Sequence, residues 1–213
     1  PEWVGDVSVS DGRINEVGTV RDGLAPQGRE IVAEGAVLCP GLIDTHAHDD
    51  GAFFRHPGME FKLSQGVTTV VSGNCGFSAI PADPSKDSVA ASGGILAGLE
   101  GEFTDLNGYY AAALARNPAI NNMMLVGHNT VRSLVMGESK QAPNDVQMRE
   151  MQAHVTRALE QGACGFSSGL IYRPGRYSDT DEVTELAKMA APFDALYTTH
   201  MRNEGDKLLE AVE

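Results

Sequence analysis

The stretch PGLIDTHAH, residues 40–48, marks the point at which the pattern of the chain changes. Before it, the sequence reads as short strands and turns; after it, short apolar runs alternate with segments of helical periodicity. Five apolar runs predict β-strands, at residues 42–48, 67–71, 122–127, 163–167 and 195–200. Short, uninterrupted apolar runs are typical of parallel strands that are buried on both faces.

Helical patterns lie between these strands, at residues 105–116, 144–161 and 180–191, and a last helix is expected from about residue 206. Alternating strands and helices predict an α/β domain with a parallel sheet. The first strand ends in His-Ala-His instead of a glycine-rich phosphate-binding signature, which argues against a dinucleotide-binding fold. Functional residues at the C-terminal ends of strands are typical of the (β/α)8 TIM barrel. Residues 40–213 are therefore expected to form about five βα units, the first part of such a barrel.

Residues 1–39 have a different character. Val7 and Val9 alternate with serines, and Asp11-Gly12 is a hairpin turn signal. A second strand-like stretch runs over residues 30–37, so this segment is predicted to be part of a small β domain. A Gly/Ser/Pro-rich stretch at residues 78–94 predicts a long loop in the larger region.

His46 and His48 lie two residues apart at the end of the first predicted strand. Side chains in a strand alternate between faces, so both imidazoles are expected to point the same way, over the mouth of the barrel. Two neighbouring neutral imidazoles suit a divalent cation, usually zinc. A bare His-x-His is weak evidence, but its place in residues 40–48 makes a metal site the preferred interpretation over a chance pair in a loop.

Cys75 follows the second predicted strand, and His200 ends the fifth. A thiolate is a soft ligand for zinc and can bridge two metal ions, whereas an isolated cysteine is more often a buried apolar residue. The strand-end position of Cys75, beside the histidine pair, favours the metal role, and the same argument makes His200 a predicted ligand. His128 ends the third strand, and for it a role in orienting a ligand or substrate competes evenly with that of a core histidine.

Residues 167–172, which include Tyr172, offer hydroxyls and amides that could line a pocket, although ordinary loop chemistry explains them too. Arg202 and Glu204 lie just past His200, where an ion pair, a substrate contact and a solvated charge run are all open interpretations.

The formal net charge of -13 over 213 residues argues against a nucleic-acid or anionic-membrane partner. Hydrophobic residues make up 42%, as in a globular protein, and no apolar run is long enough for a membrane helix. The chain opens at Pro1 without the features of a signal peptide, and its three cysteines fit a reducing compartment. A cytoplasmic location is the resulting expectation, while the oligomeric state is not indicated.

The motifs resemble those of the D-aminoacylases, or N-acyl-D-amino-acid deacylases, of the amidohydrolase superfamily. The resemblance runs in order along nearly the whole chain, through residues 40–50, 65–76, 126–128, 165–175 and 200–205. Asn74-Cys75-Gly76 and the HMRNE motif from His200 to Glu204 are specific to this branch, because many related hydrolases carry a carboxylated lysine in place of the cysteine.

This resemblance implies a β-sandwich, in part residues 1–39, joined to a (β/α)8 barrel that carries Zn²⁺. Cys75 and His200 match ligands of a tightly bound zinc, and His46 and His48, with Cys75, match a second, weaker metal position. The implied reaction is hydrolysis of N-acyl-D-amino acids to a carboxylate and a D-amino acid by a metal-activated water.

The general base of the family is an aspartate on the last strand of the barrel, so no catalytic base is expected within these 213 residues. Substrate contacts are predicted for Tyr172, Arg173 and His128. Arg173 departs from the family pattern, in which a non-basic residue is expected, and it would bias the site toward acidic side chains.

Two alternatives stay open. The first is a cyclic-amide hydrolase related to hydantoinase or dihydroorotase, against which Asn74-Cys75-Gly76 argues. The second is a catalytically incomplete, metal-binding fragment, which is preferred if the 213 residues are the whole protein.

Overall fold

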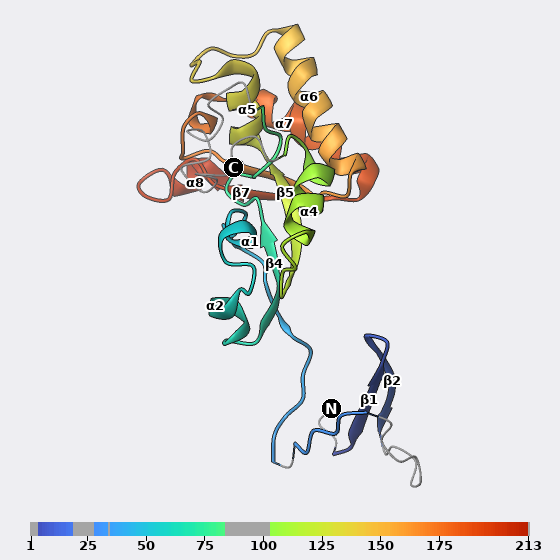
Figure 1. Ribbon diagram of the computed structural model, residues 1–213. Helices are drawn as coiled ribbons and strands as arrows, with labels where there is room; N and C mark the ends of the chain where they lie inside the picture. The colour runs from blue at the N-terminus through green and yellow to red at the C-terminus, as the bar shows by residue number, and fades with distance from the viewer. Residues whose placement is uncertain (1–3, 19–27, 34, 84–102, 213) are drawn as a thin grey trace. The chain divides into compact units, whose positions relative to one another are not determined.

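The structure is a computed structural model that describes residues 4–18, 28–33, 35–83 and 103–212 (Figure 1). The chain divides into two compact units, Pro1–Pro40 and Gly41–Glu213, and each is described by itself.

The smaller unit contains a β-hairpin. Strands β1 (Asp6–Ser10) and β2 (Arg13–Gly18) pair antiparallel, with Ser10 opposite Arg13. The turn residues Asp11 and Gly12 both have positive φ angles, 51° and 71°, as a two-residue hairpin turn requires. The hairpin predicted from Asp11-Gly12 is therefore confirmed. The strand predicted at residues 30–37 is wrong for the described part of that stretch, where no neighbouring strand supplies hydrogen-bond partners.

The larger unit is built on a parallel sheet of five strands in the order β3-β4-β5-β6-β7. These are β3 (Leu42–Asp44), β4 (Val67–Ser72), β5 (Asn121–Gly127), β6 (Gly165–Gly169) and β7 (Leu196–His200). All five predicted strands are present, in sequence order and parallel. Their bounds shift by a few residues, and the largest difference is at β3, which ends at Asp44 instead of reaching residue 48.

Helices connect the strands: α1 (Ala52–Arg55), α2 (Glu60–Leu63), α4 (Leu106–Leu114), α5 (His128–Met136), α6 (Asp145–Glu160), α7 (Thr180–Ala187) and α8 (Leu208–Val212). Two short 3₁₀ segments are η1 (Gly175–Tyr177) and η2 (Lys188–Phe193). The expected helix at residues 180–191 thus changes from α7 to η2 before Pro192, which lacks the amide that an α-helix would use.

Helix α6 shows how the local sequence sets one of these elements. Asn144 caps it by accepting from the amides of Val146 and Gln147, and the Gln147 side chain accepts in return from the Asn144 amide. Met151 and Val155, four residues apart, are completely buried and pack into the core. The amphipathic pattern therefore fixes which face of α6 meets the sheet.

The sheet is covered on one side. Alternate residues such as Met124, Val126 and Phe166 are fully buried and pack into the core cluster with α6. Figure 1 shows α5, α6 and α7 gathered around β5 and β7. Met123, next to Met124, remains 47% exposed on the other face, which is the inner face of a curled partial barrel.

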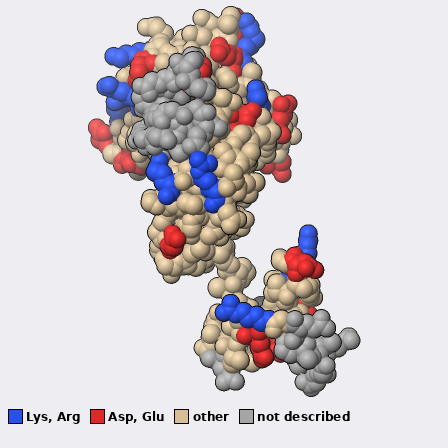
Figure 2. Space-filling model, viewed as in Figure 1, with Lys and Arg blue, Asp and Glu red and all other residues tan. Residues whose placement is uncertain are grey.

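Charged residues are spread over this unit. On the face shown in Figure 2, acidic and basic side chains lie intermixed among the described residues. None of the helices in the described part of the chain has the length and apolar character needed to span a membrane.

Candidate metal centre

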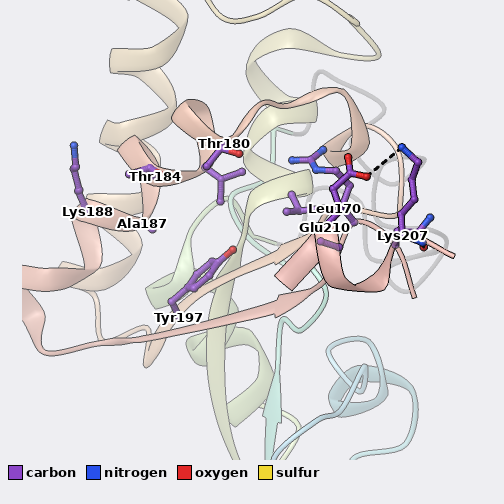
Figure 3. Close-up of a pocket in the computed structure, with 12 residues that line it drawn as sticks. Leu170, Thr180, Thr184, Ala187, Lys188, Tyr197, Lys207 and Glu210 are labelled. Carbon is purple, nitrogen blue, oxygen red and sulfur yellow. Dashed lines mark hydrogen bonds and ion pairs between the residues drawn. The ribbon is translucent and has the colours of Figure 1, made fainter. Parts of the chain in front are cut away.

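Two hollows adjoin the sheet of the larger unit. One, of about 730 Å³, lies between α7 and α8 and is lined by Leu170, Thr180, Tyr197 and Lys207 (Figure 3). Lys207 there makes a 3.2 Å ion pair with Glu210. The other, of about 310 Å³, is lined by His46 and Cys75 and by inner-face residues such as Leu125 and Thr198. The larger hollow contains none of the predicted metal ligands, so the chemistry of the chain belongs to the smaller one.

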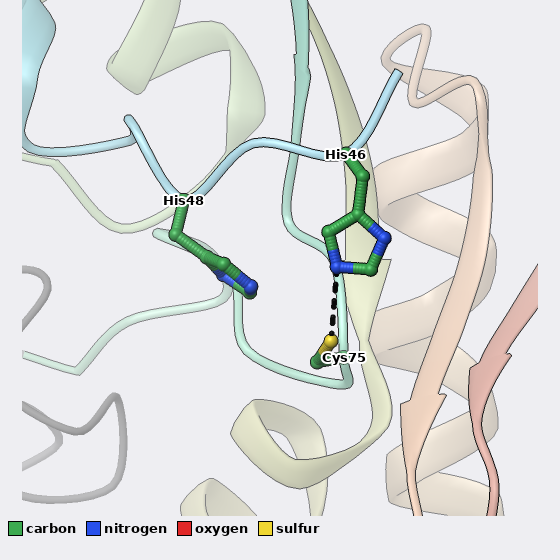
Figure 4. A group of neighbouring side chains, drawn as sticks. All are labelled: His46, His48 and Cys75. Carbon is green, nitrogen blue, oxygen red and sulfur yellow. Dashed lines mark hydrogen bonds between the residues drawn. The ribbon is translucent and has the colours of Figure 1, made fainter. Parts of the chain in front are cut away.

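His46, His48 and Cys75 converge beside this smaller hollow (Figure 4). Their ligand atoms all lie within 4.8 Å of one another, and His46 Nε2 is 3.2 Å from Cys75 Sγ. The two imidazole rings lie 5.6 Å apart in an edge-on arrangement. The structure therefore brings together the two histidines, from the loop that follows β3, and Cys75, from the loop that follows β4.

The histidines reach this position by a different route from the one predicted. They lie beyond the end of β3, but the Ala47 amide donates to the Val71 carbonyl at 3.0 Å, so the segment still runs alongside β4. Ala47 is buried, whereas His46 and His48 are exposed. Alternation of side chains thus continues past the strand and leaves both imidazoles facing the mouth.

His200, the last residue of β7, lies beside Cys75 but outside the cluster of His46, His48 and Cys75. Its Nδ1 lies 3.6 Å from Cys75 Sγ and 3.2 Å from the Tyr172 hydroxyl. Its Nε2 lies 3.0 Å from Glu204 Oε1, outside hydrogen-bonding geometry, so this contact is electrostatic only. Cys75 Sγ therefore sits between His46 on one side and His200 on the other.

The Cys75 loop has an unusual backbone. Gly73, Cys75 and Gly76 have φ angles of 78°, 55° and 78°. A Cβ on Gly73 would lie 2.0 Å from the Leu125 carbonyl oxygen, and one on Gly76 would lie 2.8 Å from the Gly169 amide nitrogen. The two glycines are thus required both for conformation and for the close approach of the loop to β5 and β6.

The donor chemistry fits a zinc ion. Partial burial of the ring, and then the proximity of His46, lower the pKa of His48, which favours the neutral imidazole that can donate a lone pair. Burial, and then Glu204, raise the pKa of the Cys75 thiol, so the thiolate needs a cation beside it to form. Neutral imidazoles with a thiolate are the nitrogen and sulfur ligands that zinc prefers.

Tyr172 lies at the edge of this group. The Tyr172 ring packs edge-on against His200 with centroids 4.8 Å apart, and the side chain is 40% exposed. Arg173, the next residue, is also exposed. Further along, Arg202 donates to the Arg176 carbonyl at 3.4 Å, while Glu204 faces His200.

His128 is not brought to this group. It is completely buried at the start of α5, and its Nε2 lies 2.8 Å from Glu182 Oε1. Glu182 in turn contacts Arg132, which donates to the carbonyls of Ser139 and Gln141. Of the two interpretations of His128, these contacts favour the core histidine and not the substrate contact.

Three residues support the site through contacts that the sequence did not indicate, although Ser167 belongs to the stretch 167–172 that was predicted to line a pocket. Lys62 Nζ lies 2.7 Å from Asp44 Oδ2 and 2.8 Å from Asp49 Oδ2, and so ties together both ends of the histidine segment. Asp50 and Ser167 are buried against the Cys75 loop. No spacing rule could have found them, because their partners are backbone groups or residues remote in sequence.

Comparison with known proteins gives consistent matches. The model of the Amidohydrolase family matches residues 29–206. An N-acyl-D-glutamate deacylase of Alcaligenes xylosoxydans xylosoxydans is 42% identical over 213 residues, which are 100% of this chain and 43% of that protein. A D-aminoacylase of the same organism is 34% identical over 212 residues, 98% of this chain and 42% of that protein.

A solved structure extends the likeness to three dimensions. It is an N-acyl-D-glutamate deacylase from Bordetella bronchiseptica, complexed with zinc and a phosphonate inhibitor that mimics the tetrahedral intermediate. It has a TM-score of 0.86 and 42% identity, and the match covers 97% of this chain and 43% of that one. The predicted fold, part of a TIM barrel preceded by a piece of a β-sandwich, is confirmed, as is the resemblance to D-aminoacylases. The chain spans less than half the length of these relatives.

Proposed function

The chain belongs to the Amidohydrolase family, and we propose that the whole protein hydrolyses the amide bond of N-acyl-D-amino acids, giving a carboxylate and a D-amino acid. One observation carries this proposal: His46, His48 and Cys75 converge just past the C-terminal ends of β3 and β4, and His200, at the end of β7, lies beside Cys75. This is the edge of a TIM barrel at which active sites are built.

The ligand set divides in two. A tight metal position is proposed at Cys75 and His200, and a second, weaker one at His46, His48 and Cys75. The placement of Cys75 Sγ, 3.2 Å from His46 Nε2 and 3.6 Å from His200 Nδ1, supports one thiolate serving both positions. Zinc held there would polarise the scissile carbonyl and make a water molecule more acidic.

The residues of this chain bind substrate, and none of them is assigned a proton transfer. The exposed Tyr172 hydroxyl, 3.2 Å from His200 Nδ1, is a hydrogen-bond donor for substrate at the mouth. The family resemblance implies that the general base is an aspartate of the last barrel strand, which is not among these residues. No proton transfer is therefore assigned to a residue of this chain.

An acidic D-amino acid is the proposed substrate. Arg173 is exposed and follows Tyr172 directly in the sequence, which supports a role for its positive charge in binding substrate. The relative that acts on N-acyl-D-glutamate is 42% identical, whereas the D-aminoacylase is 34% identical. A guanidinium is well suited to bind a carboxylate in the substrate side chain.

The test is a zinc-dependent assay of the whole protein on N-acetyl-D-glutamate, N-acetyl-D-leucine and N-acetyl-L-glutamate. We expect hydrolysis of D-substrates, fastest for D-glutamate, and none of the L-enantiomer. Absence of activity on every D-substrate would overturn the proposal. Hydrolysis of a hydantoin or of dihydroorotate in its place would support the cyclic-amide alternative, and zinc binding without any turnover would support the non-catalytic one.

The partners and the cellular location of the protein are proposed on the same basis. We propose a small-molecule substrate without nucleic-acid or membrane partners, from the net charge of -13, and a cytoplasmic location, from the sparse cysteines.

A further inference from the structure

We propose that Asp50 and Ser167 are positioning residues for the metal centre, because together they hold the loop that presents Cys75. This inference rests on the metal centre of the proposed function. It adds two buried side chains to that centre, both of which contact the backbone of the Cys75 loop or of its continuation.

The Cys75 loop needs to be held. Cys75 has a φ angle of 55°, in the left-handed region that L-residues with a Cβ rarely adopt. Such a conformation persists only where the surrounding structure determines it. The hydrogen bonds to the backbone on either side of Cys75 are therefore part of what aims its thiol.

Ser167, on β6, bridges the two sides of Cys75. Its hydroxyl donates to the Gly73 carbonyl and accepts from the Gly76 amide at 3.0 Å. The side chain is completely buried, so no solvent can replace these bonds without a rearrangement. One hydroxyl thus fixes the chain immediately before and after Asn74 and Cys75.

Asp50 holds the same loop through hydrogen bonds from backbone amides. Its carboxylate accepts from the Ala79 amide at 2.9 Å and, more weakly, from the Gly73 amide at 3.4 Å. Asp50 is completely buried and lies two residues after His48, in the segment that carries both histidines. The carboxylate therefore couples the position of the histidine segment to that of the Cys75 loop.

Loss of the hydrogen bonds made by either Ser167 or Asp50 should move the Cys75 thiol relative to His46 and His200. Removing the Ser167 hydroxyl leaves a buried carbonyl and a buried amide unpaired, and the loop can recover them only by changing its backbone angles. Cys75 Sγ, now between His46 and His200, would then no longer face both of them at once.

Ser168 provides a matched control. It is the next residue of β6, is equally buried, and its hydroxyl lies 2.7 Å from both the Tyr197 hydroxyl and Thr199 Oγ1. Because side chains alternate along a strand, Ser168 points away from the Cys75 loop. Ser167→Ala and Ser168→Ala each remove one hydroxyl that is fully buried and has two hydrogen-bond partners.

The experiment titrates Co²⁺ into metal-free whole protein and follows the thiolate-to-cobalt charge-transfer band, together with the Kd and the thermal unfolding temperature. We expect Ser167→Ala to weaken Co²⁺ binding by about 10–100-fold, the usual effect of losing a residue that orients a ligand, and to alter the band. Asp50→Asn, which keeps one acceptor oxygen, should weaken binding by about tenfold. Ser168→Ala should lower the unfolding temperature with an unchanged band and Kd.

Wild-type Kd and band in Ser167→Ala would overturn the proposal, as would equal weakening in Ser167→Ala and Ser168→Ala, which would indicate a general effect of stability. If Ser167→Ala does not fold, Asp50→Asn is judged against Ser168→Ala by the same criteria. Absence of a thiolate band in the wild-type protein would instead overturn the proposed metal centre, so the two failures are distinguishable.

Discussion

Two groups of polar side chains, one at the C-terminal ends of strands and one on helices α5 and α7, differ in how their atoms are paired. The metal-centre group contains His46, His48 and Cys75, whose ligand atoms lie within 4.8 Å of one another, and His200, whose Nδ1 lies 3.6 Å from Cys75 Sγ. The buried ion cluster contains His128, Arg132 and Glu182, in which both carboxylate oxygens have charged or imidazole partners.

The difference shows what separates a binding site from a structural network. In the buried ion cluster, the glutamate supplies the acceptors that a histidine and an arginine require, although His128 Nδ1 still has no partner. In the metal-centre group, each neutral imidazole offers one lone pair and a cysteine thiolate offers more, and among the described residues no carboxylate pairs with His46 or Cys75, so a cation suits this set of ligands. The metal-centre group should therefore control binding and the buried ion cluster should control stability.

The largest expected effect separates the two groups directly. Cys75→Ala removes the thiolate that lies between both proposed metal positions. We expect metal affinity and turnover to fall by more than about 100-fold, beyond the usual effect of losing an outer partner. Elemental analysis of zinc after dialysis against a chelator, with an assay on N-acetyl-D-glutamate, measures both. Full zinc retention in the variant would contradict the assignment of Cys75.

The converse change is Glu182→Gln in the buried ion cluster. It leaves Arg132 buried without a full counter-charge, and we expect the free energy of unfolding to fall by about 3–5 kcal/mol. Urea denaturation measures the loss, and the zinc content of the folded variant should stay at the wild-type value. Glu204→Gln, at a side chain that is 60% exposed, is the stability control and should cost little. Loss of zinc with no loss of stability in Glu182→Gln would remove the distinction between the groups.

These two predictions rest on different kinds of sequence information. The four metal ligands were predictable because each follows a strand, and parallel strands bring their C-terminal ends to one edge. The pairing of His128 with Glu182, 54 residues later, was not predictable, because it depends on how α5 packs near α7. Helix α5 itself was not predicted, because it begins at His128, directly after β5, and its N-cap residue Gly127 has no capping side chain.

Other errors have similar physical origins. The first strand was drawn to residue 48 because alternation continues beyond Asp44, although regular pairing with β4 has stopped. Lys62, which bridges Asp44 and Asp49, lies on a helix of one turn with no periodic pattern to predict it. Sequence thus revealed residues with distinctive chemistry at strand ends, but not the ordinary residues that hold them.

A smaller effect is expected on the choice of substrate side chain beside the metal-centre group. Arg173→Ala should raise the KM for N-acetyl-D-glutamate by about tenfold, equivalent to about 1.4 kcal/mol, through loss of one charged contact. The KM for N-acetyl-D-leucine should not change. Arg149→Ala, an exposed arginine of α6, is the matched control. Equal effects of Arg173→Ala on both substrates would argue against a role in side-chain selection.

The smallest expected effect concerns pairing near the surface. The hydrogen bond from the Gly108 amide, followed by those from Gln161 and Arg157, lowers the pKa of Asp105 at the start of α4. Its contribution to stability is therefore complete above the ordinary pKa of 3.8 and is lost as the pH falls through the lower folded-state value.

Asp105→Ala should cost about 0.5–2 kcal/mol near neutral pH, as for other helix caps. Denaturation curves measured at neutral pH and at a pH below the folded-state pKa of Asp105 give the free energy of unfolding of wild type and variant. The difference between the two proteins should shrink in acid. A difference that grows in acid would show that the sign of this linkage is wrong.

X-ray absorption at the zinc edge of the whole protein tests the central claim most directly. Cys75 and the histidines should give a sulfur scatterer at about 2.3 Å and nitrogen scatterers at about 2.0–2.1 Å from zinc. The sulfur scatterer should disappear in Cys75→Ala. A zinc shell of nitrogen and oxygen alone in the wild-type protein would contradict the account.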